Sequence, residues 1–385
     1  MTTSETKPEL SVPRWTDLLS GLQERHTRTW VRLGNLESRL LSERLNSVAI
    51  EKPIYIAGLA RSGTTILLEL LSRHPHLASH RYRDFPPVLT PWFWNWFVDR
   101  AGTGDEGTSE RAHGDGIDVT PESPEAFEEV IWMAFFPQLH DPEVSSVLTA
   151  DTAHEEFEQF YRDHIRKLLL LRGGQRYLCK ANYNLTRLGY LLKLFPDARF
   201  LLPIRDPVWH IASLMRQHER FCGEHRRDDR LRRHMSRAGH FEFGLDRRPI
   251  NSGNPEATRE VRELWEKGNE VEGWALYWTD LHGRVADQLE RDGALRAATM
   301  VVDYEMLCRR PGSVMSEVLT HCDLHPGEID LVAEAKRTVR PPTYYRPAFS
   351  DGQVALIERV TSPVKRRFDA FTRFEAPHDV GLKHL

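Results

Sequence analysis

The sequence predicts an α/β fold in three layers, with a central, mainly parallel β-sheet flanked by helices and a helical lid inserted late in the chain. Two stretches carry this prediction. Residues 54–75 have the pattern of an apolar strand, a glycine-bearing turn and a helix, and residues 176–221 have the pattern of strand, helix, strand and helix. The short connections favour parallel strands with right-handed crossovers. A chain of 385 residues is long enough to bury such a core.

The first 50 residues are predicted to form an N-terminal helical segment, followed by one α/β domain over residues 51–385. Apolar residues recur at helical spacing between residues 13 and 48, namely Leu18, Leu19, Leu22, Trp30, Leu33, Leu36, Leu40 and Leu41. The N-terminus has neither the basic region nor the apolar region of a signal peptide.

The rest of the chain is predicted to contain a surface loop, a lid or insertion, three further helices and a late strand. Residues 100–127 are rich in glycine, serine and acidic residues, which predicts a surface loop. Residues 220–260 are rich in arginine and histidine with little periodicity, which is typical of a lid or an insertion. Further helices are expected at 154–171, 256–290 and 311–322, and a late strand within 297–307.

Composition excludes several classes of protein. The net charge of −4 lacks the basic excess of nucleic-acid-binding proteins, so no nucleic-acid partner is expected. The four cysteines are scattered without C-x-x-C spacing, which argues against a zinc site or a disulfide framework and favours a reducing compartment. No run of about 18 apolar residues is present, so no transmembrane segment is expected. We therefore expect a cytoplasmic protein.

The turn after the first strand has the spacing of a phosphate loop. Gly58 and Gly63 are followed by Thr64 and Thr65, so the motif is G-x-x-x-x-G-T-T, with Thr64 where a nucleoside triphosphatase has lysine. Backbone N–H groups from Ser62 onward would lie at a helix N-terminus and bind an anion. Arg61 adds a positive charge to the same loop. The pattern predicts a P-loop-like anion site built for something other than a Mg²⁺-bound triphosphate.

A second anion motif occurs at the next strand–helix junction. Arg205 ends the strand, Pro207 suits the first turn of the helix, and Ser213 follows Arg205 by eight residues, about two helical turns. Both side chains could hold one phosphate, although a strand-end salt bridge and an ordinary helix serine would give the same pattern.

Together the two motifs resemble those of the sulfotransferases that use 3′-phosphoadenosine 5′-phosphosulfate (PAPS). "ARSGTT" is similar to their 5′-phosphosulfate loop and "RDPVWHIAS" to their 3′-phosphate motif. The likeness is to tyrosylprotein sulfotransferases and bacterial sulfotransferase-3-type relatives, over residues 53–215 and more loosely 298–324. It implies PAPS as co-substrate, no metal, and a donor site formed by Arg61, Ser62, Gly63, Thr64, Thr65, Arg205, Ser213 and Tyr304.

The resemblance also implies catalytic residues. Arg61 and Lys180 are the expected cations that stabilise negative charge on the bridging oxygen. Cytosolic sulfotransferases carry a histidine base two residues after the lysine, but here that position is Asn182. Tyrosylprotein sulfotransferases use a carboxylate after the first helix, which nominates Asp84 as base and His80 as second choice. Asp84 stands among arginines, so a structural ion pair is the alternative.

The expected activity is transfer of a sulfuryl group from PAPS to a hydroxyl group of a small-molecule, lipid or glycan acceptor. A P-loop kinase or NTPase-like enzyme and a catalytically inactive nucleotide-binding relative are the alternatives. His240 and Glu242, in the predicted lid, are candidates for contact with the acceptor. The aromatic segment 92–97 could form core, acceptor pocket or membrane contact, and a homo-oligomer is left open.

Overall fold

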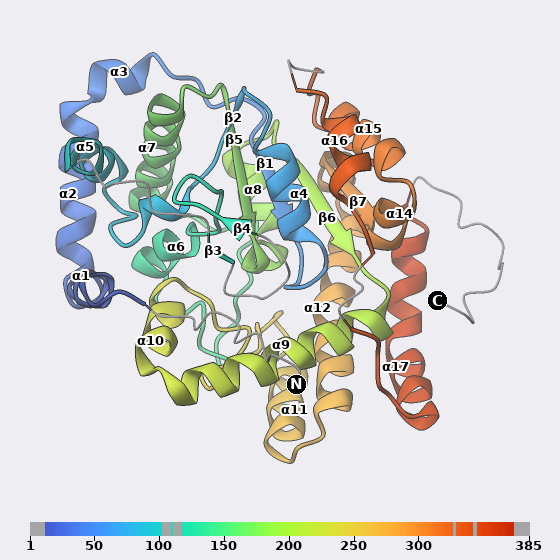
Figure 1. Ribbon diagram of the computed structural model, residues 1–385. Helices are drawn as coiled ribbons and strands as arrows, with labels where there is room; N and C mark the ends of the chain where they lie inside the picture. Colours follow the sequence, from blue (N-terminus) through green and yellow to red (C-terminus); the bar gives the residue numbers. More distant parts are fainter. Residues whose placement is uncertain (1–11, 102–108, 111–117, 326–328, 342–344, 373–385) are drawn as a thin grey trace, which may run out of the picture.

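The computed structural model describes residues 12–101, 109–110, 118–325, 329–341 and 345–372. Its centre is a parallel five-stranded sheet of strand order β2-β5-β1-β6-β7 (Figure 1). The strands are β1 (Ile54–Ala57), β2 (Leu77–Ala78), β5 (Arg176–Ala181), β6 (Arg199–Ile204) and β7 (Thr299–Asp303). The predicted α/β fold with a parallel sheet is confirmed.

Helices cover both faces of the sheet because alternate strand side chains point to opposite sides. Ile54 and Ile56 of β1 pack with one group of helices, and Tyr55 and Ala57 pack with the other. The first group is α4 (Thr64–Leu71), α14 (Tyr304–Arg309), α15 (Pro311–His321) and α16 (Leu331–Thr338). The second group includes α6 (Glu129–Phe135), α7 (Glu155–Arg172), α8 (Leu188–Leu194) and α12 (Glu270–Arg291). The result is the expected three-layer arrangement.

The N-terminal segment is helical, as the sequence predicts. It forms α1 (Arg14–Arg25), α2 (Thr27–Leu40) and α3 (Ser42–Asn46), which lie beside α5 (Pro91–Ala101) at one edge of the molecule (Figure 1). Of the predicted loop 100–127, the structure describes a short antiparallel ribbon and the residues that follow it. The ribbon strands are β3 (Ser109–Glu110) and β4 (Asp118–Val119), and residues 102–108 and 111–117 lie outside the described part.

The predicted lid region contains more helix than its sequence suggests. Helix α9 (Pro207–Arg227) continues past residue 221, and α10 (Asp229–Arg237) follows at once. The extension lacks an apolar signal because its buried residue is His225, whose ring contacts Met235 of α10. After α10 the chain is irregular until α11 (Pro255–Glu266).

The remaining short elements complete the connections. The helix predicted over 184–196 begins as the 3₁₀ turn η2 (Asn182–Thr186) before α8, and a second 3₁₀ turn, η1 (Tyr82–Asp84), precedes α5. Helix α13 (Gly293–Ala298) leads into β7, and α17 (Asp351–Asp369) packs against α9 and α12.

Candidate active site

The candidate site lies at the carboxyl edge of the sheet, where open α/β sheets bind their ligands. The pairing of Ile56 with Lys180 places the end of β5 beside the phosphate loop that follows β1. The pairing of Ile204 with Asp303 likewise places Arg205 and Tyr304 on neighbouring strand ends. The parallel register therefore brings four separate segments to one edge.

The phosphate loop is too tightly packed for side chains at its two glycines. A Cβ atom on Gly63 would lie 2.6 Å from Cδ2 of Tyr304, and one on Gly58 would lie 2.8 Å from Oγ of Ser62. Gly63 also has a φ of 104°, which glycine adopts without strain. Arg61, by contrast, holds a φ of 71°, a conformation that costs a non-glycine residue about 1 kcal/mol or more. The loop is held in a strained turn at the N-terminus of α4.

The two anion motifs meet in the folded protein. Nε of Arg61 donates to Oγ of Ser213 over 3.3 Å, and a terminal nitrogen of Arg205 donates to the carbonyl oxygen of Arg61 over 3.2 Å. The guanidinium of Arg205 also lies 4.7 Å from the centre of the Tyr304 ring. Four residues that the sequence assigned to the donor site are therefore in one cluster.

Tyr345 belongs to the same cluster and was missed by the sequence reasoning. Its hydroxyl accepts a hydrogen bond from Arg205 at 2.5 Å and donates to the carbonyl oxygen of Trp209. It lies 140 residues after Arg205 in a segment without regular structure. No local pattern marks it, so only the folded structure could identify it.

Glu305 lies beside the start of α9, next to Tyr304 in the sequence. Its carboxylate oxygens accept from the backbone N–H of Asp206, the residue whose side chain caps α9. Burial, together with the charges of Asp303 and Asp206, raises the pKa of Glu305 to about 7.

A pocket joins the phosphate loop to the lid. Its lining includes Arg61, Thr64, Thr65 and Lys180 from the sheet edge, and it is completed by Ala60, Asn182, Met235, His240, Glu242 and Phe243. The predicted cation Lys180 and the lid residues His240 and Glu242 thus face one space. The segment predicted as a lid therefore contributes polar side chains to the lining of this pocket.

Asn182 connects the lid to β5. Its side-chain amide donates to Glu242 over 2.6 Å, and Nδ1 of His240 lies 3.8 Å from the other oxygen of Glu242. Burial raises the pKa of Glu242, but His240 and Asn182 outweigh burial and hold this pKa below its usual value. Asn182, at the position where cytosolic sulfotransferases have a histidine, therefore holds Glu242 next to His240.

Asp84 lies outside the lining of this pocket, in a fully buried network. One carboxylate oxygen accepts from Arg172 at 2.5 Å and from Asn95 at 3.0 Å, and the other accepts from the backbone N–H of Arg81. Burial alone raises the pKa of Asp84, but His80 and Arg172 hold it well below its usual value. These contacts are those of the structural ion pair that the sequence left as the alternative.

His80, the second candidate base, is also buried and outside that lining. Its Nε2 lies 3.1 Å from Nε2 of His164, and its Nδ1 lies 3.6 Å from Asp84. Neither candidate base from the sequence is thus among the side chains that line the pocket with Lys180.

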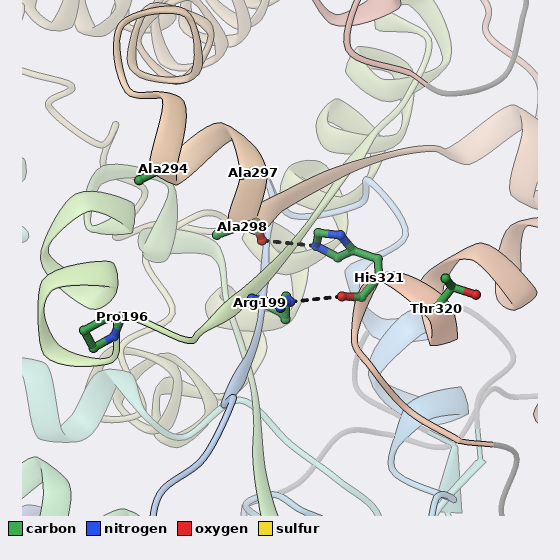
Figure 2. A pocket seen from close by; sticks show the side chains of 7 residues that line it. All are labelled: Pro196, Arg199, Ala294, Ala297, Ala298, Thr320 and His321. Carbon is green, nitrogen blue, oxygen red and sulfur yellow. Dashed lines mark hydrogen bonds between the residues drawn. The ribbon is translucent and has the colours of Figure 1, made fainter.

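Another cavity lies at the opposite, amino edge of the sheet and carries no such chemistry. Figure 2 shows its lining, in which Arg199 donates to the carbonyl oxygen of His321 and His321 donates to that of Ala298. The other lining residues are Pro196, Ala294, Ala297 and Thr320. Its polar side chains are engaged in hydrogen bonds to backbone carbonyl groups, which is a structural role.

The described ranges of the chain, residues 12–101, 109–110, 118–325, 329–341 and 345–372, offer neither a metal cluster nor a membrane-spanning helix. No group of three or more histidine, cysteine, aspartate or glutamate residues there is arranged to hold a metal ion. None of the helices there combines the length and apolar content that a bilayer crossing requires.

Several solved structures of bacterial enzymes are similar to the chain. Sulfotransferase STF1 of Mycobacterium tuberculosis H37Rv has 17% identity, with 91% of this chain and 86% of that chain covered and a TM-score of 0.45. Sulfotransferase STF9 of Mycobacterium avium has 16% identity, with 88% of this chain and 82% of that chain covered and a TM-score of 0.47. A sulfotransferase of Alicyclobacillus acidocaldarius has 15% identity, 85% and 98% coverage and a TM-score of 0.40.

No curated protein matches the chain in sequence. A model of the sulfotransferase family, however, matches residues 53–248, about half of the chain. The matched range runs from the strand before the phosphate loop to the end of the segment that carries His240 and Glu242. That range contains both anion motifs and Lys180, so the chain belongs to the sulfotransferase family and is an enzyme of that family.

Proposed function

We propose that this enzyme transfers the sulfuryl group of PAPS to a hydroxyl group of a small-molecule, lipid or glycan acceptor. The observation that carries the proposal is the contact between the two anion motifs, in which Arg61 bonds to Ser213 across 152 residues of sequence. A phosphate-binding loop beside a separate arginine and serine suits a nucleotide that is charged at both its 5′ and 3′ positions.

The residues present fit such a donor. Oγ of Ser62 and Nε of Arg205 are buried and have no hydrogen-bond partner among the described residues. A buried donor without an acceptor costs about 1–3 kcal/mol, so each is expected to meet an acceptor when the site is in use. Phosphate and sulfate oxygens are such acceptors.

The proposed roles follow from position. Thr64 and Thr65 would bind the 5′-phosphosulfate at the start of α4, and Arg205 with Ser213 would bind the 3′-phosphate. Arg61 and Lys180 would stabilise the negative charge that grows on the bridging oxygen. When bound, the donor supplies an activated sulfuryl group and leaves as adenosine 3′,5′-bisphosphate.

We assign the general base to His240 instead of Asp84 or His80, because His240 lines the pocket with Lys180. Nδ1 of His240 faces the carboxylate of Glu242, which favours the tautomer with its proton on Nδ1. Nε2 is then able to accept the proton of the acceptor hydroxyl. Asn182 and Glu242 act here as positioning residues.

A cytoplasmic location is part of the same proposal. The proposal rests on the scattered positions of the four cysteines in the sequence, since a reducing compartment places no demand for disulfide pairs.

Titration calorimetry with two nucleotides tests the donor assignment. Arg205→Ala should weaken binding of adenosine 3′,5′-bisphosphate by about 10- to 100-fold, because a charged hydrogen bond to phosphate is lost. Binding of adenosine 5′-phosphate should change much less. Arg259→Ala, an exposed residue on α11, serves as the charge-matched control and should leave both affinities unchanged. Equal losses for the two nucleotides would remove the 3′-phosphate assignment.

A further inference from the structure

The exposed apolar side chains of this protein are concentrated on three helices. Within the described residues, eleven large hydrophobic side chains are exposed, and nine of them belong to α1, α2 and α5. These nine, which we call the apolar face, are Trp15, Leu18, Leu22, Leu33, Leu36, Leu40, Phe93, Trp96 and Phe97. Leu18 is 74% exposed and Leu40 is 68% exposed, so these side chains are open to solvent and not merely partly covered.

The amphipathic pattern of the three helices is reversed. A surface helix usually buries its apolar stripe, but each of these helices exposes it at spacings of three, four or seven residues. The residues that they bury are mostly small or polar, with Val31 of α2 as an apolar exception. Helix by helix they are Thr16, Ser20 and Gln23, then Val31, Gly34, Glu37 and Ser38, then Pro91 and Asn95. Polar contacts hold them in place, such as the buried ion pair of Glu37 with Lys167 at 2.9 Å.

Aromatic contacts join the stripes of α1 and α5, and a hydrogen bond holds α2 against α5. The rings of Trp15 on α1 and Trp94 on α5 are 6.3 Å apart, and Trp94 stacks on Phe97. Glu37 of α2 accepts a hydrogen bond from the backbone N–H of Phe93, which fixes α5 against α2. Figure 1 shows the three helices together at one edge of the molecule. An area this apolar and this contiguous indicates an interaction surface.

The helices that carry the apolar face, together with α3, are rich in exposed arginine. Seven exposed arginines belong to the helices α1, α2, α3 and α5, namely Arg14, Arg25, Arg28, Arg32, Arg39, Arg44 and Arg100. Two of them lie on tryptophan rings, Arg100 over Trp96 and Arg44 over Trp92.

The acidic residues of the same helices are mostly engaged elsewhere. Asp17 and Glu24 pair with arginines of α10, Glu37 with Lys167, and Asp99 with Arg83. The fifth acidic residue of these helices, Glu43, is exposed, so the seven exposed arginines leave an excess of positive charge on this side of the protein.

We propose that the apolar face docks on an anionic lipid surface, with the three helices lying in the plane of the interface. Tryptophan, phenylalanine and leucine would enter the boundary of the acyl chains, and the arginines would reach the headgroups. A second copy of the chain fits less well, because a two-fold interface would bring the exposed arginines of both copies together. The proposal does not depend on the identity of the sulfuryl donor.

This surface also touches the lid. Arg233 and Arg237 of α10 bond to Asp17 of α1 at 2.9 and 2.7 Å, and α10 carries Met235, which lines the candidate pocket. A membrane in contact with α1 would therefore lie one helix away from the lid.

Co-sedimentation with vesicles tests the docking surface on the full chain. The wild type should bind vesicles of mixed phosphatidylcholine and phosphatidylserine at least about tenfold more tightly than phosphatidylcholine alone, and added salt should weaken binding. Leu18→Gln with Trp96→Ser should reduce this binding by about tenfold or more, because apolar area buried in the boundary is lost. Ile329→Gln is the matched control, because Ile329 is exposed but lies outside the apolar face.

Thermal unfolding and light scattering complete the experiment. The variants should keep the melting temperature of the wild type, because the replaced side chains are exposed. Absence of vesicle binding, equal binding to both vesicle types, or a dimer that Leu18→Gln with Trp96→Ser dissociates would each overturn the lipid proposal.

Discussion

Asp84 and His240, two candidates for the general base, differ in their burial and in their contacts. Both oxygens of Asp84 are engaged by Arg172, Asn95 and the backbone of Arg81, and the side chain is fully buried. These bonds hold η1 and α5 against the end of α7. His240 is partly exposed and lines the candidate pocket. The two residues should therefore respond to substitution in opposite ways.

His240→Gln should lower turnover by about 100-fold or more, because general-base catalysis typically contributes this much. It should also leave the melting temperature nearly unchanged. Asp84→Asn should instead lower the free energy of unfolding by about 3 kcal/mol or more, because Arg172 would lose its buried partner.

Steady-state rates across pH and urea unfolding of both variants measure these effects. If Asp84→Asn abolished turnover at full stability while His240→Gln stayed fully active, the general base would be Asp84 and not His240.

At the scale of elements, helix ends decide the shape of the site. Gly63 precedes α4 with a φ of 104°, and Gly173 follows α7 with a φ of 66°. The two glycines differ in the space around them. A Cβ atom on Gly63 would collide with the Tyr304 ring, whereas nothing lies within 4 Å of a Cβ atom on Gly173. Substitution of Gly173 therefore tests the cost of the left-handed backbone alone, whereas substitution of Gly63 adds a steric clash with Tyr304.

Gly173→Ala should cost about 1 kcal/mol of folding free energy, which is the price of a left-handed conformation for alanine. Gly63→Ala should cost more and should also weaken nucleotide binding, because Tyr304 must move away from both Gly63 and Arg205. Urea unfolding and nucleotide titration of the two variants check this expectation. Equal stability losses with unaltered binding would show that Tyr304 does not shape the loop.

At the scale of the whole molecule, histidines that are buried or partly buried affect the response to acid. Burial lowers the pKa of His218, His234 and His282 to about 4 each. In the unfolded chain these groups take up protons near pH 6.5, so the unfolded state binds more protons between pH 6.5 and 4. Stability is fully present above that window and falls as pH drops through it. Glu305 acts in the opposite direction, because its raised pKa favours the folded state at low pH.

Each such histidine should contribute a slope of about 1.4 kcal/mol per pH unit between pH 6.5 and 4. His282→Phe should reduce the total slope by about that amount, because phenylalanine keeps a ring beside Trp278 but binds no proton. Urea midpoints at several pH values measure it. A slope identical to that of the wild type would mean that folding does not lower the pKa of His282.

Local chemistry explains how much of this protein can be predicted from its sequence. The parallel sheet follows from apolar strands with short helical crossovers, and the loop from Gly58 to Thr65 carries its glycines, charge and helix start in contiguous residues. The spacing of Arg205 and Ser213 is likewise local. These features need only neighbouring residues, so the α/β fold and the location of the anion motifs could be predicted.

Contacts between distant segments could not be predicted in the same way. The approach of Tyr345 to Arg205, the bond from Asn182 to Glu242 and the enclosure of Asp84 all depend on packing of segments far apart in the chain. Helical spacing likewise predicts that Leu18, Leu36 and their neighbours share a helix side, but not whether that side faces the core. By itself, the sequence determined the fold class and both anion motifs. Only the tertiary structure decided which side chains meet at the pocket and that the N-terminal helices turn their apolar side outward, because burial is a property of the packed molecule.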